Sequence, residues 1–245
     1  MDTCDVSNLE MYKQVMAGQK TLLNAAKARQ GQLPRDRKSR AELVHIFMVR
    51  NGMRMMEQLT VHYEYQLHTS FVPPPYPPST TRLKKLKPIY IKDLRLETHH
   101  RGSYLLIRSI TPPNRMTAIM AIVEDENGDA TLLQLYQQSD ENIRPTTSII
   151  TENDVFIIKE PFFKVTSDGG YGLRIDHVSD LVYIDTSNNI LPTQWAPSVL
   201  DIDKTAGDWK VEGNNAMKRK QYWTAVQRYV ISSMVCGHVL TKSIL

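Results

Sequence analysis

The sequence predicts an α+β protein built from N-terminal helices, a small five-stranded β-barrel and one C-terminal helical hairpin. Apolar residues recur at spacings of three and four over residues 8–30, which is the period of an amphipathic helix. Residues 88–185 are instead rich in β-branched and aromatic residues grouped in short runs, as strands are. The stretch 209–229, WKVEGNNAMKRKQYWTAVQRY, returns to a helical pattern with small residues where two helices would meet.

Composition limits the class of protein. The 245 residues are 41% hydrophobic and 23% charged, which is ordinary for a globular protein with a real core. The net charge of +4 allows an acidic partner without requiring one. The two cysteines, Cys4 and Cys236, are far apart, which excludes a disulfide framework and favours a reducing compartment. No apolar run approaches the ~20 residues of a membrane span, so we expect no membrane contact and a cytoplasmic or nuclear location.

Two helices are expected in the N-terminal region, residues 1–71. The first covers residues 8–30 and ends at Gly31. The second begins near Ser39, because Ser39 and Glu42 have the spacing of a capping box, in which each side chain bonds a free amide of the first turn. We interpret the region as a helix pair or an interaction arm.

Residues 72–87 combine prolines with basic residues and are expected to form a linker. Five prolines fall within residues 73–78. Proline fixes φ and removes an amide donor, so helix and sheet are both excluded there. We interpret the stretch as a semi-rigid spacer, with a PxxP ligand for an aromatic groove as the alternative.

Five strands are expected within residues 88–185. The dipeptide Asn127-Gly128 separates the second from the third, because it accepts positive φ at both central positions of a hairpin turn. The polar stretch 139–153 separates the third from the fourth. This arrangement favours a small OB-like barrel, with a generic five-stranded barrel or sandwich as the alternative. The predicted strands are 104–110, 116–125, 130–137, 154–165 and 171–184.

A basic run leads into the predicted barrel. Residues 82–95, RLKKLKPIYIKDLR, contain six basic side chains and one acidic side chain. Beside an OB-like face, such cations would follow a nucleic-acid backbone while aromatic rings stack on bases. A solvated linker is the alternative interpretation. The nucleic-acid candidates are Lys84, Lys85, Lys87, Tyr90 and Tyr104.

Two groups of residues contain side chains that are often catalytic or metal-binding, but their spacing does not bring these side chains together. The segment Asp176–Asp180 contains Asp, His and Ser, but neighbours on a strand point to opposite faces and do not converge as a hydrolase triad. His99 and His100 diverge in the same way, without accompanying metal ligands. We therefore expect no catalytic residue, no metal ligand and no cofactor in this chain.

The C-terminal stretch has large and small residues at the spacings of a tetratricopeptide repeat, in which two antiparallel helices pack closely. Gly213 is expected to let the second helix approach, and Ala225 to be the small residue that meets it. An ordinary amphipathic hairpin is the alternative. The residues expected to carry the repeat fold are Trp209, Gly213, Asn214, Tyr222, Ala225 and Tyr229.

A single repeat is expected over residues 205–239, joined to the barrel by a connector at 186–204 and followed by a tail at 240–245. One repeat does not bury both faces of its hairpin, and about three are usually needed. We expect the exposed surface to bind a protein partner. The candidates for a polar binding face are Lys210, Asn214, Lys218 and Arg228.

Three stretches read KPIYIKDLRLETHHRGSYLLIRSITPPNRMTAIMAIVEDENGDATLLQLYQQ, EPFFKVTSDGGYGLRIDHVSDLVYI and LDIDKTAGDWKVEGNNAMKRKQYWTAVQRY. They closely resemble the N-terminal half of fungal proteins that contain tetratricopeptide repeats and a SET domain, over about residues 85–230. The resemblance implies an intracellular fungal protein whose full-length relatives methylate protein lysines with S-adenosylmethionine. After Tyr229 we find no SET motif, so we carry this chemistry to no residue and interpret the chain as truncated.

These observations predict a non-catalytic intracellular protein-interaction module that binds a protein partner through the repeat, takes no small-molecule substrate and is not an enzyme. The first alternative is the truncated front half of a SET-domain protein-lysine methyltransferase. The second is nucleic-acid binding by the OB-like barrel.

Overall fold

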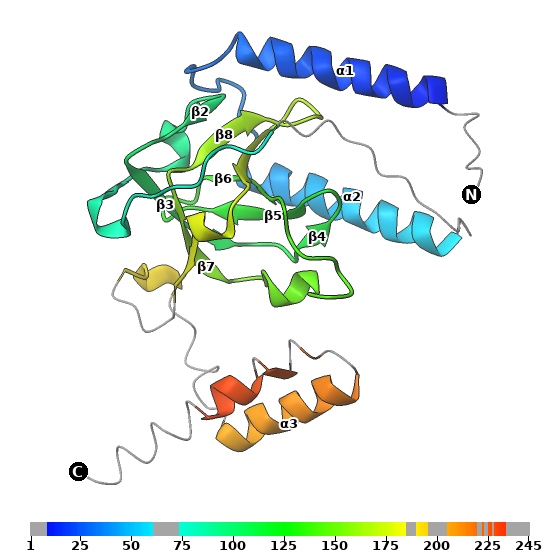
Figure 1. Ribbon diagram of the computed structural model, residues 1–245, viewed down its shortest axis with the longest axis vertical. Coiled ribbons are helices and arrows are strands. Elements are labelled where there is room, and N and C mark those ends of the chain that lie inside the picture. Colours follow the sequence, from blue (N-terminus) through cyan, green and yellow to red (C-terminus); the bar gives the residue numbers. More distant parts are fainter. Residues whose placement is uncertain are drawn as a thin grey trace. The chain divides into compact units, whose positions relative to one another are not determined.

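The structure is a computed structural model in which the chain divides into two compact units (Figure 1). The first comprises Met1–Gln138 and Ile150–Ile184, and the second comprises Ser139–Ile149 and Asp185–Leu245. The residues described are 9–60, 74–184, 190–195, 205–219, 222, 225–226 and 228–233. The predicted tail at 240–245 and most of the predicted connector at 186–204 lie outside them.

The first unit is built around a ten-stranded sheet. Its strands follow the order β10-β7-β3-β5-β6-β9-β8-β2, with β1 paired to β3 and β4 paired to β5. The α+β class is therefore confirmed, but the prediction of a five-stranded barrel is wrong. The strands are β1 Lys87–Pro88, β2 Thr98–His99, β3 Ser103–Ser109, β4 Asn114–Arg115, β5 Ile119–Glu124, β6 Ala130–Leu135, β7 Val155–Lys159, β8 Phe162–Val165, β9 Tyr171–Ile175 and β10 Leu181–Tyr183.

Two causes explain the larger number of strands. The predicted strand 154–165 is divided into β7 and β8 at Glu160, whose φ of +48° takes the backbone out of the extended region. In addition, β1, β2 and β4 are two residues long, which is too short for a periodic pattern to reveal. Pairing runs from β3 through β5, β6 and β9 to β8, while β7 pairs with the other side of β3, so the longer strands form one continuous sheet.

The core of the first unit is formed largely by residues of this sheet. Buried and half-buried residues alternate along β3 and β6, which is the period of a strand covered more on one face. Residues of β5, β7 and β9 are buried on both faces, so other elements cover their second side. The largest fully buried side chains are Phe156, Phe163, Ile91, Leu94, Leu96, Leu105, Ile107, Ile119, Leu133, Leu135, Ile150 and Ile157.

Two helices precede the sheet, as predicted (Figure 1). They are α1, Leu9–Lys27, which contacts β8, and α2, Arg40–Thr60, which contacts β5 and β6. The capping box of α2 is confirmed, because Glu42 Oε2 accepts from the Ser39 amide at 2.8 Å and the Glu42 amide donates to Ser39 Oγ. Arg40 Nε donates to Glu124 Oε2 at 2.5 Å and joins α2 to the end of β5. Neither described helix is long and apolar enough to cross a membrane.

The second unit contains α3, Ala206–Lys218. Thr205 and Asp208 begin it with a second capping box, in which the Thr205 amide donates to Asp208 Oδ2 at 2.8 Å. Further helical backbone is described at residues 222, 225–226 and 228–233.

Candidate functional site

The proline-rich stretch lies against the sheet. We call residues 74–81 the proline strap. The Tyr76 amide donates to Asp176 Oδ2 at 3.2 Å, and the Ser79 amide donates to Asp180 Oδ1 at 2.9 Å. Proline has no amide hydrogen, so non-proline residues must supply these bonds. The strap is thus attached to the segment after β9, which differs from the spacer that its composition predicts.

Tyr76 anchors the proline strap through an aromatic cluster. Its ring centroid lies 4.5 Å from that of His99, 5.6 Å from that of His177 and 5.9 Å from that of Phe162. Its hydroxyl donates to the Arg174 carbonyl at 3.2 Å. Burial raises the pKa of the Tyr76 phenol and lowers the pKa of His99, so both side chains are neutral at pH 7.

Glu160 holds the end of the proline strap. Its carboxylate accepts from the Gly102 amide at 2.9 Å, from Arg101 Nη1 at 2.8 Å and from Thr81 Oγ1 at 3.2 Å. Burial by itself would raise the pKa of Glu160, but these hydrogen bonds outweigh it and lower the pKa to about 2. The positive φ of this non-glycine residue is therefore offset by the contacts of its side chain.

The segment Asp176–Asp180 does not form a hydrolase triad. Asp176 Oδ1 accepts from Arg174 Nε at 2.8 Å, and both side chains are buried. His177 Nε2 contacts the Tyr76 carbonyl, and Asp180 accepts from Ser79. These polar groups therefore serve the attachment of the proline strap.

His99 and His100 also have structural partners. His100 Nε2 accepts from the Arg95 amide at 3.0 Å, which leaves Nδ1 to donate to the Pro161 carbonyl at 3.0 Å. His99 packs on Tyr76 and Phe162. Within the described residues, no three His, Cys, Asp or Glu side chains gather as metal ligands.

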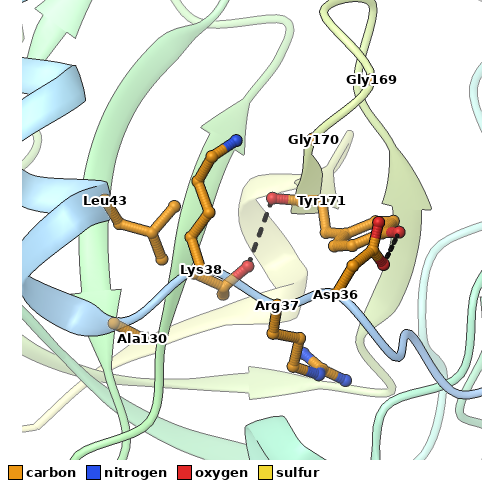
Figure 2. Close-up of a pocket in the computed structure, with 9 residues that line it drawn as sticks. Asp36, Arg37, Lys38, Leu43, Ala130, Gly169, Gly170 and Tyr171 are labelled. Atoms are coloured by element: carbon orange, nitrogen blue, oxygen red, sulfur yellow. Dashed lines mark hydrogen bonds between the residues drawn. The ribbon is translucent and has the colours of Figure 1, made fainter.

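A pocket of about 80 Å³ lies where the approach to α2 meets β9 (Figure 2). Tyr171 Oη donates to Asp36 Oδ1 at 2.5 Å, and this bond is the main cause of the lowered pKa of Asp36. Arg29 Nη2 donates to the same hydroxyl at 2.9 Å. Figure 2 shows the Lys38 side chain extended away from this pair. Because Asp36, Tyr171 and Arg29 bind one another, the pocket offers a ligand few free polar groups.

The nucleic-acid candidates lie in and around β1, which pairs with the start of β3. Lys84 and Lys85 lie in a short 3-10 helix, Leu83–Lys85, and Lys87 lies in β1; all three are exposed. The parallel pairing of β1 with β3 places Pro88 opposite Tyr104. Tyr104 is half-buried, as is Tyr90, whose ring lies 5.7 Å from Lys92 Nζ.

The repeat-fold candidates meet in the second unit. A Cβ placed on Gly213 would lie 2.7 Å from Tyr229 Cε1, so the two backbones approach where the side chain is missing. Ala225 is fully buried, and Tyr229 Oη donates to Asn214 Oδ1 at 2.8 Å. Tyr222 is 60% exposed. The helices are therefore in close contact, while their assignment to a tetratricopeptide repeat remains a prediction.

Two of the four proposed binding residues have partners within the hairpin. Arg228 Nε lies 3.3 Å from Glu212 Oε2, and its guanidinium stands 4.9 Å from the Trp209 ring centroid. Asn214 accepts from Tyr229. Lys210 and Lys218 are exposed.

Sequence reasoning did not single out Lys164 in β8. This residue is 7% exposed and lies beside a cavity of about 340 Å³ together with Arg174 and Glu97. One signal was available, because the run Phe162–Val165, FFKV, places a lysine between residues that favour burial.

A curated relative covers nearly the whole chain. A protein named "Methyltransferase" from Gibberella zeae is 39% identical over 229 residues, which are 94% of this chain and 29% of the relative. The chain therefore spans less than a third of the length of this fungal protein. No protein-family model matches the chain.

Two solved structures are similar to part of the chain. The OB domain of a Methanosarcina mazei protein has a TM-score of 0.27 at 8% identity, covering 39% of this chain and 79% of that domain. An OBody bound to hen egg-white lysozyme has a TM-score of 0.25 at 19% identity, covering 35% of this chain and 85% of its own. TM-scores this low do not establish a shared fold.

The Gibberella relative corrects two expectations. A relative named methyltransferase points to a catalytic function, which overturns both the non-catalytic protein-interaction module and the conclusion that the chain is not an enzyme. The error arose because a missing catalytic motif was equated with a missing activity, although an enzyme can place its reacting residues in another part of its chain. The predicted resemblance to fungal methyltransferases is confirmed by this relative. The tetratricopeptide repeats and the SET domain stay predictions.

Proposed function

We propose that this chain is part of a protein-lysine methyltransferase that uses S-adenosylmethionine and contains tetratricopeptide repeats and a SET domain. The observation that carries the proposal is the 39% identity to the Gibberella zeae methyltransferase across 94% of this chain. The contact of Gly213 with Tyr229 and the burial of Ala225 support the assignment of residues 205–239 to one repeat.

A chimera tests the proposal. In the Gibberella relative, the matching segment is replaced by this chain, and transfer of a labelled methyl group from S-adenosylmethionine to fungal protein lysines is measured. The chimera is expected to retain transfer, because the two segments are 39% identical over 229 residues. A folded, monodisperse chimera without transfer, under conditions in which the relative is active, would overturn the proposal.

A second candidate function is nucleic-acid binding around β1, where it pairs with β3. The supporting observation is that Lys84, Lys85 and Lys87 are exposed beside Tyr104, without an ion pair within the described residues. Such an arrangement suits a phosphate backbone with a stacking ring beside it. The dependence of binding on salt concentration tests it.

A further inference from the structure

The cavity beside Lys164 is lined by five separate parts of the first unit: α1, the proline strap, Glu97, β8 and β9. It has a volume of about 340 Å³, within the range of small-ligand sites. Lys20 and Lys27 reach it from α1, Tyr76 from the proline strap, and Lys164 from β8. Elements distant in the sequence thus meet around one space.

Lys164 is a buried cation whose described contact is with an aromatic ring. Its side chain makes no hydrogen bond or ion pair within the described residues, and its ammonium lies 5.7 Å from the Tyr136 ring centroid. Burial, followed by the charge of Arg174, lowers the pKa of Lys164 to about 8, so it is still mostly protonated at pH 7. An unpaired buried charge is costly, and an anion beside it would offset that cost.

The charges around the cavity favour an anion. Lys20 and Lys27 are exposed and unpaired within the described chain. Arg174 is neutralised by Asp176. Glu97 is the acidic residue among those that line the cavity, and its Oε1 accepts a hydrogen bond from the Val165 amide at 2.8 Å. The three lysines therefore exceed the acidic groups that face them.

Apart from Asn24, the rest of the lining is apolar or aromatic. Leu23 contributes from α1, Pro74 from the proline strap and Phe162 from β8. The ring centroids of Tyr76 and Phe162 stand 5.9 Å apart with the ring planes at 45°, and both aromatic side chains contribute surface to the cavity lining. Planar ligand groups pack well on such surfaces.

We propose that this cavity binds a small organic anion with a planar ring, of the class of nucleoside monophosphates, with the anionic group at Lys164. The lysines of α1 would contact the same group from the solvent side. The ring would pack among Phe162, Tyr76 and Leu23. This inference does not depend on methyl transfer.

Isothermal titration calorimetry with adenosine monophosphate tests the site, with adenosine and inorganic phosphate as comparison probes. Adenosine monophosphate is expected to bind more tightly than either probe, and Lys164→Met to weaken it at least tenfold. Lys13→Met is the matched control, because Lys13 lies on α1 outside the lining and pairs with the exposed Glu10. The control should bind like the wild type.

Three outcomes would overturn the site: no binding of adenosine monophosphate, equal binding by Lys164→Met, or phosphate binding as tightly as the nucleotide. If Lys164→Met does not fold, the pKa of Lys164 in the wild type is followed by NMR instead. The nucleotide should raise that pKa, and an unchanged value would overturn the site. Neither measurement involves S-adenosylmethionine, so a negative binding result is distinct from a loss of methyl transfer.

Discussion

The ring of Tyr229 occupies the space that a side chain on Gly213 would need. Cε1 and Cδ1 of the ring would lie 2.7 and 2.8 Å from a Cβ at that position. The ring is also fixed at its far end, where Tyr229 Oη donates to Asn214. Close packing of the two helical segments therefore depends on the absence of one methyl group.

Replacing Gly213 by alanine should destabilise the second unit. Alanine in an ordinary helix position is more favourable than glycine by about 1 kcal/mol, but the clash with Tyr229 reverses the sign here. We expect a loss of about 1–3 kcal/mol, measured by urea denaturation followed by circular dichroism. Gly207→Ala in the same helix is the control, since its nearest neighbour is Thr205 Oγ1 at 3.4 Å. Stabilisation by Gly213→Ala would contradict the packing.

The carboxylate of Glu160 should make the free energy of unfolding depend on pH in the acidic range. Its pKa is lowered from 4.5 to about 2 in the folded chain, so the stability it contributes is present above about pH 4.5. That contribution decreases as the pH falls toward 2. Glu160→Gln should therefore reduce stability at pH 7 and flatten its decline between pH 5 and 2, measured by urea denaturation at each pH. Glu152→Gln, at an exposed position, should leave the pH profile unchanged.

Removing the Tyr76 ring should release the proline strap. The ring contacts His99, His177 and Phe162, and its loss should cost about 2–4 kcal/mol. We expect trypsin to cleave Tyr76→Ala at Arg82 much faster than the wild type, as identified by mass spectrometry of the fragments. Tyr76→Phe keeps the ring contacts and should be cleaved at nearly the wild-type rate. Equal protection of Tyr76→Ala would show that the main-chain bonds hold the strap without the ring.

The lysines near β1 should contribute to any affinity for single-stranded nucleic acid. Changing Lys84, Lys85 and Lys87 to alanine removes three cations. If all three contact phosphates, the slope of log affinity against log salt should become shallower by about 2. Fluorescence anisotropy with a labelled oligonucleotide measures this slope. Arg115→Ala, on β4, is the comparison variant, and an equal change in its slope would argue against an interface at β1.

The sequence alone determined the features that depend on neighbouring residues. Ser39 and Glu42 stand three residues apart, so their capping box follows from spacing. The Asn-Gly pair lies at the turn between β5 and β6 as predicted, although only Gly128, with a φ of +82°, and not Asn127 adopts a positive φ. Each feature is stabilised within a few residues, and no distant contact is needed to specify it.

The tertiary structure decided which distant residues share an environment. Tyr76 meets Asp176 across 100 residues of chain, and Lys164 is buried in β8 where α1 and the proline strap line the same cavity. The division of 154–165 at Glu160 likewise depends on partners at Gly102 and Arg101. Such contacts arise from strand pairing and burial, which a residue's own neighbours do not encode. For this physical reason, the spacing of the sequence predicted the cap of α2 and the place of the turn but not the cavity.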